Sequence, residues 1–185
     1  MGELSASAEA ALLRAASAGD GGACRRLVEL HLRPVHRLAQ RMLDDPAEAE
    51  DVAQDLFLRL WQAGASWREG EARLSTWIHT VTLNLCRDRL RRRRPQQPLD
   101  DAQQDERGAG PGQRAQLDER ESALRRALAE LPQRQREALL LFHYQGLSQV
   151  EAAQALGVSE DALESLLARA RRGLKARLIE HREAS

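Results

Sequence analysis

Residues 147–175, LSQVEAAQALGVSEDALESLLARARRGLK, constrain the fold of this chain more than any other stretch. Ser148 and Glu151 have the spacing of a capping box, in which two side chains bond the free backbone N–H groups at the start of a helix. Gly157 falls where a tight turn favours a left-handed backbone, and Ser159 is placed to cap a second helix. The stretch therefore predicts a helix-turn-helix.

The second helix of this motif has two different faces. Its apolar residues recur at helical spacing and predict a buried stripe made of Leu163, Leu167, Ala170, Leu174 and Leu178. The other face carries Ser165, Arg169, Arg172 and Lys175. A surface helix with a basic face is what docking in the major groove of DNA requires. The alternative interpretation is an ordinary αα-corner with a purely structural role.

Charge is balanced over the whole chain but unevenly distributed along it. The 28 basic and 28 acidic residues give a formal net charge of zero, which provides no overall attraction to a polyanion. Residues 87–94, however, contain six arginines and one acid, whereas residues 95–116 contain four acids and two arginines. Such segregated patches allow a neutral protein to bind DNA.

Several kinds of site have no signature in the sequence. Cys24 and Cys86 lie far apart, without a CxxC pair or clustered histidines, and indicate core thiols in a reducing compartment; a redox-sensing pair is the alternative. No Gly-rich phosphate loop, HExxH or GxSxG motif is present, and neither a signal peptide nor an apolar span is evident. We therefore expect a cytoplasmic protein that is not an enzyme, with no cofactor, metal, small-molecule substrate or membrane insertion.

The N-terminal half reads as a series of helices, over residues 8–18, 23–43, 46–63 and 74–94, with a kink expected at Pro34. Asp45, Pro46 and Glu48 predict a second capping box. In the third helix a buried stripe is predicted for Ala49, Val52, Ala53, Leu56 and Leu60. The opposite, mixed-charge face holds Asp51, Gln54, Asp55, Arg59 and Gln62, with Leu58 among them. An apolar residue in such a face suits contact with another protein, although single exposed leucines are also common.

The middle of the chain predicts a change of domain. The helix over residues 74–94 ends in RLRRRR, more cations than the helix dipole alone uses, which favours phosphate binding over a simple solvated face. Residues 95–116 are rich in Pro, Gly, Gln and acid and predict a flexible linker. Helices follow over residues 117–130 and 132–144, with Gly146 as a stop. Because aromatic residues are only 3% of the chain, the core is expected to be mainly Leu, Ala and Val, in an all-α fold of two small domains, 1–94 and 117–185.

Taken together, these motifs resemble the extracytoplasmic-function (ECF) group of bacterial RNA polymerase sigma factors. Residues 49–61, AEDVAQDLFLRLW, resemble the helix with which the family binds core polymerase. Residues 67–93 resemble the segment that opens and reads the minus-10 promoter element. Residues 131–159, LPQRQREALLLFHYQGLSQVEAAQALGVS, follow the family's region 4 pattern, and the helix after them corresponds to its minus-35 reader.

The resemblance implies a sigma factor that binds core RNA polymerase, directs it to specific promoter DNA and helps to melt the minus-10 element, under the control of an anti-sigma factor. Residues 1–94 would be region 2, residues 117–185 region 4, and the acidic linker between them would thread toward the polymerase active-site and RNA-exit channel. In this interpretation residues 67–73 hold a base flipped from the melted strand.

The resemblance also implies a role for individual residues. Polymerase would be bound by Asp51, Gln54, Asp55, Leu58 and Arg59. The minus-10 element would be bound by Trp67, Arg68, Arg73, Trp77, Asn84, Arg87, Arg91, Arg92 and Arg93. The minus-35 element would be bound by Glu164, Ser165, Ala168, Arg169, Arg172 and Lys175.

The predicted minus-35 helix departs from the family pattern. Where the family usually has Thr-Val-Lys-Ser-Arg-Leu, residues 162–167 read ALESLL, with two fewer cations, and Ala152 replaces a usual isoleucine in the preceding helix. Glu164 is able to accept a hydrogen bond from a cytosine amino group. Such a bond would add selectivity for the base rather than binding affinity. Two alternatives stay open at this point: a one-component helix-turn-helix regulator, and a second domain that serves only protein interaction.

Overall fold

The computed structural model describes residues 5–67, 73–93 and 113–183, with side chains for 5–67, 73–93 and 121–180. Its helices are α1 (Ala6–Ser17), α2 (Gly21–Leu43), α3 (Pro46–Gly64), α4 (Leu74–Arg93), α5 (Gln113–Ala129), α6 (Gln133–Leu139), the π-helical turn η2 (Leu140–Tyr144), α7 (Gln149–Leu156) and α8 (Glu160–Glu183). The described residues form helices and no strand, which confirms the predicted all-α class.

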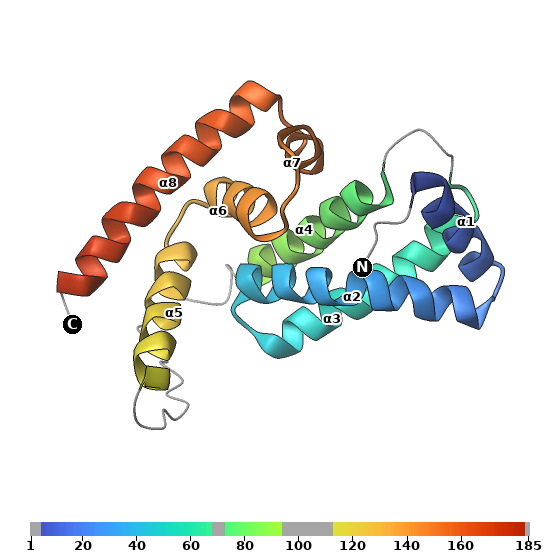
Figure 1. Ribbon diagram of the computed structural model, residues 1–185, viewed down its shortest axis with the longest axis horizontal. Helices are drawn as coiled ribbons and strands as arrows, with labels where there is room; N and C mark the ends of the chain where they lie inside the picture. Colours follow the sequence, from blue (N-terminus) through green and yellow to red (C-terminus); the bar gives the residue numbers. More distant parts are fainter. Residues whose placement is uncertain (1–4, 68–72, 94–112, 184–185) are drawn as a thin grey trace.

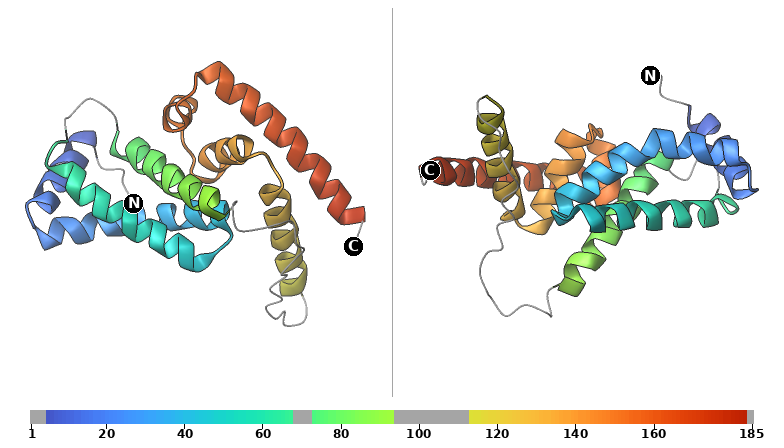
Figure 2. Two further views of the ribbon diagram at one scale, coloured as in Figure 1. Left: turned by 180° about the vertical axis from the view of Figure 1, so that it is seen from behind. Right: turned by 90° about the horizontal axis from the view of Figure 1, so that it is seen from below.

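The helices gather into two groups, which we call the N-terminal domain (α1–α4) and the C-terminal domain (α5–α8). In Figure 1 and from behind in Figure 2, α1, α2 and α3 lie at one side of the molecule and α8 at the other. Helices α4, α6 and α7 lie between them. The main part of the predicted linker, residues 95–112, lies outside the described residues, and the prediction of its flexibility stays untested.

Helix starts follow the caps that the sequence predicted. The Ser148 hydroxyl accepts a hydrogen bond from the Glu151 backbone N–H at 3.3 Å, and the Glu151 carboxylate accepts from the Ser148 N–H at 3.0 Å, so the capping box is complete. Gly157 ends α7 in the left-handed region, at φ 66°, and the Ser159 hydroxyl caps α8. The helix-turn-helix prediction is therefore confirmed in its local geometry.

The second predicted capping box forms only in part. The Asp45 carboxylate accepts from the Glu48 backbone N–H at 3.1 Å, as expected. The Glu48 carboxylate, however, turns to Arg93, with 2.8 Å between the charged atoms. A long-range ion pair has here replaced a local hydrogen bond, because the end of α4 passes close to the start of α3.

Some helix boundaries differ from the prediction. Helix α5 begins at Gln113, four residues before the expected start at Leu117, and the single helix expected over residues 132–144 is divided into α6 and η2. In η2 the backbone widens, so that the Gln145 N–H bonds the Leu140 carbonyl at 3.0 Å. Helix α2 stays one helix across Pro34, whose carbonyl accepts a hydrogen bond from the Gln145 side chain at 3.2 Å.

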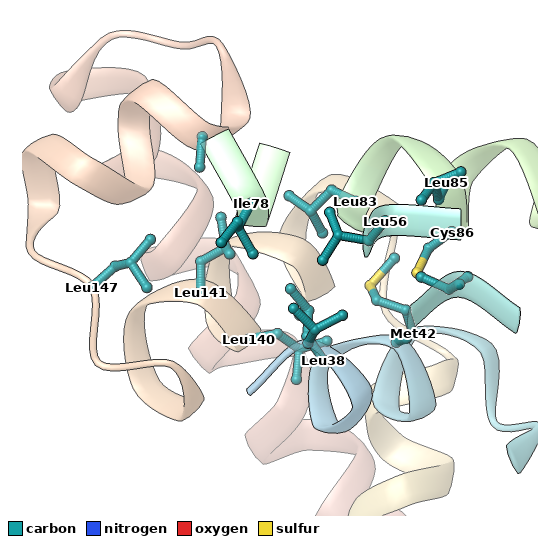
Figure 3. Close-up of a cluster of buried hydrophobic side chains, with 14 of the residues drawn as sticks. Leu38, Met42, Leu56, Ile78, Leu83, Leu85, Cys86, Leu140, Leu141 and Leu147 are labelled. Atoms are coloured by element: carbon teal, nitrogen blue, oxygen red, sulfur yellow. The ribbon is translucent and has the colours of Figure 1, made fainter. Parts of the chain in front are cut away.

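One hydrophobic core runs through both domains. The predicted stripe of α3 is buried against α2 and α4. The same core continues into Leu140, Leu141 and Leu147. Figure 3 shows Leu140 beside Leu38 and Leu141 beside Ile78 of the N-terminal domain, with Leu147 on the outer side of Leu141. A smaller core joins α5, α6 and α8 through Leu128, Leu131, Leu139 and Ala170. Helix α4 is consequently packed on two sides, with α2 and α3 on one and the C-terminal domain on the other.

Candidate interaction surfaces

An apolar groove of about 1080 Å³ lies between α2 and α3 on the N-terminal domain. Leu58 is on its rim with 60% of its surface exposed, and Leu32 of α2 is 41% exposed beside it. Phe57 and Trp61 add aromatic surface, with their ring centroids 5.7 Å apart. We call this surface the α2/α3 groove. Exposed leucines around an aromatic floor are typical of a site that another protein's helix covers.

The α2/α3 groove contains part of the predicted polymerase-binding face. Gln54 and Leu58 line the groove, whereas Asp51 and Arg59 are exposed outside it. Asp55 is directed toward α4, where its carboxylate accepts a hydrogen bond from the Arg89 guanidinium at 3.0 Å. The sequence interpretation missed Leu32, Phe57 and Trp61. An available signal was Leu32, an apolar residue outside the buried stripe of its helix.

Two aromatic rings flank the predicted minus-10 loop, Trp67 at its start and Trp77 on α4. Trp67 and Trp77 are both half-buried and meet edge to face, with centroids 6.0 Å apart. Arg68 and the rest of the loop to residue 72 lie outside the described residues. Arg73 is exposed, and its guanidinium donates to the Glu151 carboxylate of α7 at 3.0 Å. The structure therefore brings the C-terminal domain against the edge of this predicted site.

Arg87, a second predicted DNA contact, also pairs with the C-terminal domain. Its Nε and Nη2 atoms donate to the two carboxylate oxygens of Glu137 on α6, at 2.8 and 2.7 Å. Glu137 is fully buried and also accepts from the Gln133 amide at 3.0 Å. The bidentate hydrogen bond to Glu137 raises the pKa of the Arg87 guanidinium. This is the geometry in which an arginine would hold a phosphate, but an acid of the same chain occupies it.

The cationic end of α4 is less available than the sequence suggested. Arg91 pairs with Asp88 at 2.9 Å, and Arg93 reaches Glu48 and the Leu43 carbonyl, the latter at 2.9 Å. Arg92 is exposed, and so is Asn84, which accepts a hydrogen bond from Arg87. The count of charge along the sequence did not reveal these pairs, because most of the acids lie on other helices: Glu48 on α3 pairs with Arg93 and Glu137 on α6 pairs with Arg87.

The predicted minus-35 residues share one exposed face of α8. Those exposed are Glu164, Ser165, Ala168, Arg169, Arg172 and Lys175. The opposite stripe is buried at Leu163, Leu167 and Ala170 and only half-buried at Leu174 and Leu178. Burial decreases along α8 because its last turns extend past α6, and the exposed face points away from the core as the amphipathic pattern predicted.

Other kinds of site receive little support from the part of the chain that the structure describes. No helix there is long and apolar enough to cross a membrane, and no three potential metal ligands gather there. Both cysteines are free thiols, and burial raises the pKa of Cys86 to about 12, which keeps it protonated and unreactive at neutral pH.

Comparison with known proteins identifies two family regions in the chain. Residues 27–96 match Sigma-70 region 2, and residues 121–174 match Sigma-70 region 4. The chain is 38% identical to the ECF RNA polymerase sigma factor SigM of Mycobacterium tuberculosis, over 92% of this chain and 84% of SigM. It is 32% identical to the RNA polymerase sigma factor NccH of Alcaligenes xylosoxydans xylosoxydans, over 93% of this chain and 95% of NccH.

Two solved structures match most of this chain. CnrH, in complex with the cytosolic domain of CnrY, matches 94% of this chain and 98% of its own, with a TM-score of 0.72 and 28% identity. RpoE of Bartonella quintana, crystallised with the anti-sigma factor NepR, shares the fold with a TM-score of 0.64 at 23% identity, over 83% of this chain and 95% of RpoE. Both sigma regions are thus present, in the expected order, and the chain belongs to the ECF family of RNA polymerase sigma factors.

Proposed function

We propose that this sigma factor docks on core RNA polymerase through the α2/α3 groove, with Leu58 as the central contact. The observation that carries the proposal is the 60% exposure of this leucine beside an open apolar groove. An exposed leucine of this kind loses water only when a partner covers it. Gln54 and Leu32 would contribute to the same contact, while Asp51 and Arg59 would lie at its edge.

Each domain would read one promoter element. In this proposal residues 1–94 act as region 2 and bind the minus-10 element with Asn84, Arg92 and the arginines of α4. Residues 117–185 act as region 4, and the exposed face of α8 enters the groove of the minus-35 element. Arg87 would exchange Glu137 for a DNA phosphate, so promoter binding would require the C-terminal domain to leave α4.

Regulation is expected to act on the same surfaces. CnrH was solved with the cytosolic domain of CnrY, and by analogy a protein partner of the anti-sigma type would compete with polymerase for the α2/α3 groove. We propose that the chain works in the cytoplasm, together with polymerase, and has no catalytic activity of its own. Family membership sets aside the alternative of a one-component regulator.

The direct test is run-off transcription with bacterial core polymerase, with and without this chain, on a promoter library read by sequencing. We expect specific starts that appear only when the chain is added, and the aligned sequences should contain both promoter elements. Starts that share a minus-10 element but no minus-35 element would show that α8 no longer reads sequence. An absence of binding to core polymerase would contradict the proposal itself.

A further inference from the structure

A second cavity, separate from the α2/α3 groove, lies where the end of α4 meets the C-terminal domain. It has a volume of about 710 Å³, within the size range of small-molecule sites. Five arginines from three helices line it, namely Arg87, Arg91 and Arg93 of α4, Arg136 of α6 and Arg177 of α8. Its one acidic lining residue is Glu130, and Leu90 and Pro132 contribute apolar wall.

Four of these arginines already have acidic partners. These pairs are Arg87 with Glu137, Arg91 with Asp88, Arg93 with Glu48, and Arg177 with Glu130. Arg136 differs from them: it is only 9% exposed, and it makes neither an ion pair nor a hydrogen bond with any residue that the structure describes. Its Nε atom is fully shielded and has no acceptor.

A buried guanidinium N–H without an acceptor, such as the Arg136 Nε–H, is energetically unfavourable. Arginine keeps its proton in proteins, so burial does not let it become neutral as a lysine would. Desolvation lowers the pKa of Arg136, and the nearby charge of Glu137 offsets this only in part. Such a group is stabilised when an anion supplies both the opposite charge and hydrogen-bond acceptors.

We propose that this cavity binds a small phosphorylated anion of diphosphate size, held by Arg136 together with Arg91 and Arg177. Guanidinium groups from three helices suit a multivalent, multi-oxygen ligand, because each planar fork can bond two phosphate oxygens. Leu90 and Pro132 would face an apolar part of the ligand. Since α4 belongs to the N-terminal domain and α6 and α8 to the other, the bound anion would hold the two domains together.

The test uses the full-length chain and inorganic pyrophosphate as the probe, by isothermal titration calorimetry at constant ionic strength. We expect saturable binding with one site and a rise in Tm. Arg136→Gln should weaken binding by at least about tenfold, since it removes a charge-assisted bidentate contact. Arg177→Gln should weaken it less, because Arg177 shares its charge with Glu130. Arg125→Gln, the same change at an exposed position of α5 outside the cavity, should have no effect.

Several results would overturn the proposal. One is an absence of pyrophosphate binding at millimolar concentration, and another is a Tm rise equal to that given by sodium chloride of the same ionic strength. Equal affinity in wild type and Arg136→Gln is a third. If Arg136→Gln loses its helical circular dichroism, Arg177→Gln decides, and unchanged affinity in that variant rejects the site. A short DNA duplex that binds through Arg136 where pyrophosphate does not would assign the cavity to DNA instead. None of these outcomes depends on transcription by polymerase.

Discussion

The α2/α3 groove and the outer face of α4 belong to the same domain but differ in what covers them. The groove stands open, with Leu32 and Leu58 in contact with solvent. The face of α4 is covered by α7 and contacted by α6, and several of its arginines are paired with acids, most fully in the Arg87–Glu137 contact. An open apolar groove is ready for a protein partner, whereas a covered cationic face must first be released.

The largest effect of a substitution is expected in the open α2/α3 groove. Leu58→Asp places a charge in the α2/α3 groove and should weaken binding to core polymerase by at least about a hundredfold, since buried unpaired charge is strongly unfavourable at an interface. The fold should stay intact because Leu58 is mostly exposed. Fluorescence anisotropy of the labelled chain titrated with core polymerase measures the affinity. Ile179→Asp, an equally drastic change at an exposed position of α8, is the matched control.

If Leu58→Asp bound core polymerase as tightly as the wild type, the α2/α3 groove would not be part of the polymerase interface.

The second-largest effect is expected at the contact between α4 and α6. Glu137→Met leaves the half-buried Arg87 guanidinium without its acid and should lower the free energy of unfolding by about 2–3 kcal/mol. Combining it with Arg87→Met should recover most of the loss, because two apolar side chains can pack where the ion pair was. Urea denaturation of the wild type, both single variants and the double variant gives the coupling energy. Additive losses would show that the pair does not join α4 to α6.

A third prediction concerns pH and the buried His79 of α4. Its Nδ1 atom lies 2.6 Å from the Ser75 carbonyl, its Nε2 atom is buried without a partner, and desolvation lowers its pKa. The unfolded chain therefore takes up the proton first, so stability is complete above the unfolded pKa near 6.5 and decreases as the pH falls below it. The slope should be at most about 1.4 kcal/mol per pH unit.

Urea denaturation at pH 7.5, 6.5 and 5.5 measures this slope, and His79→Gln should flatten it. An equal slope in the variant would assign the effect to other groups, such as carboxylates that titrate lower.

The smallest effect should come from the second contact between the domains. Arg73→Gln removes an ion pair with Glu151 whose arginine is 69% exposed, and exposed pairs contribute little. The expected change in the free energy of unfolding is below about 0.5 kcal/mol. Ser148→Ala, which removes the cap of α7, should cost about 1 kcal/mol in the same measurement. If Arg73→Gln cost more than Glu137→Met, the domain contact would depend on Arg73 and Glu151 rather than on Arg87 and Glu137.

Features set by neighbouring residues were predictable from the sequence. The capping box at Ser148, the turn at Gly157 and the buried stripe of α3 each depend on side chains within one or two helical turns. Exposure of Leu58 also followed from helical spacing. The all-α class and the helix-turn-helix were therefore predicted correctly.

Features set by contacts between distant residues were not predictable in this way. Glu137 pairs with Arg87 across 50 positions, and Arg93 draws Glu48 away from its local hydrogen bond. The widened turn η2 carries Leu140 and Leu141 into the core that they share with the N-terminal domain. A count of charge along α4 could not show which of its cations are neutralised.

The shared core has a thermodynamic consequence for any separation of the two domains. Breaking ion pairs alone exposes little apolar surface, but moving the C-terminal domain away from α4 uncovers Leu140, Leu141 and Leu147 together with Ile78. Exposure of apolar surface raises the heat capacity, so the equilibrium between joined and separated domains must curve with temperature. If α4 binds DNA as proposed, the fraction of chains able to present it changes with temperature, and the leucines beneath the arginines set that temperature dependence.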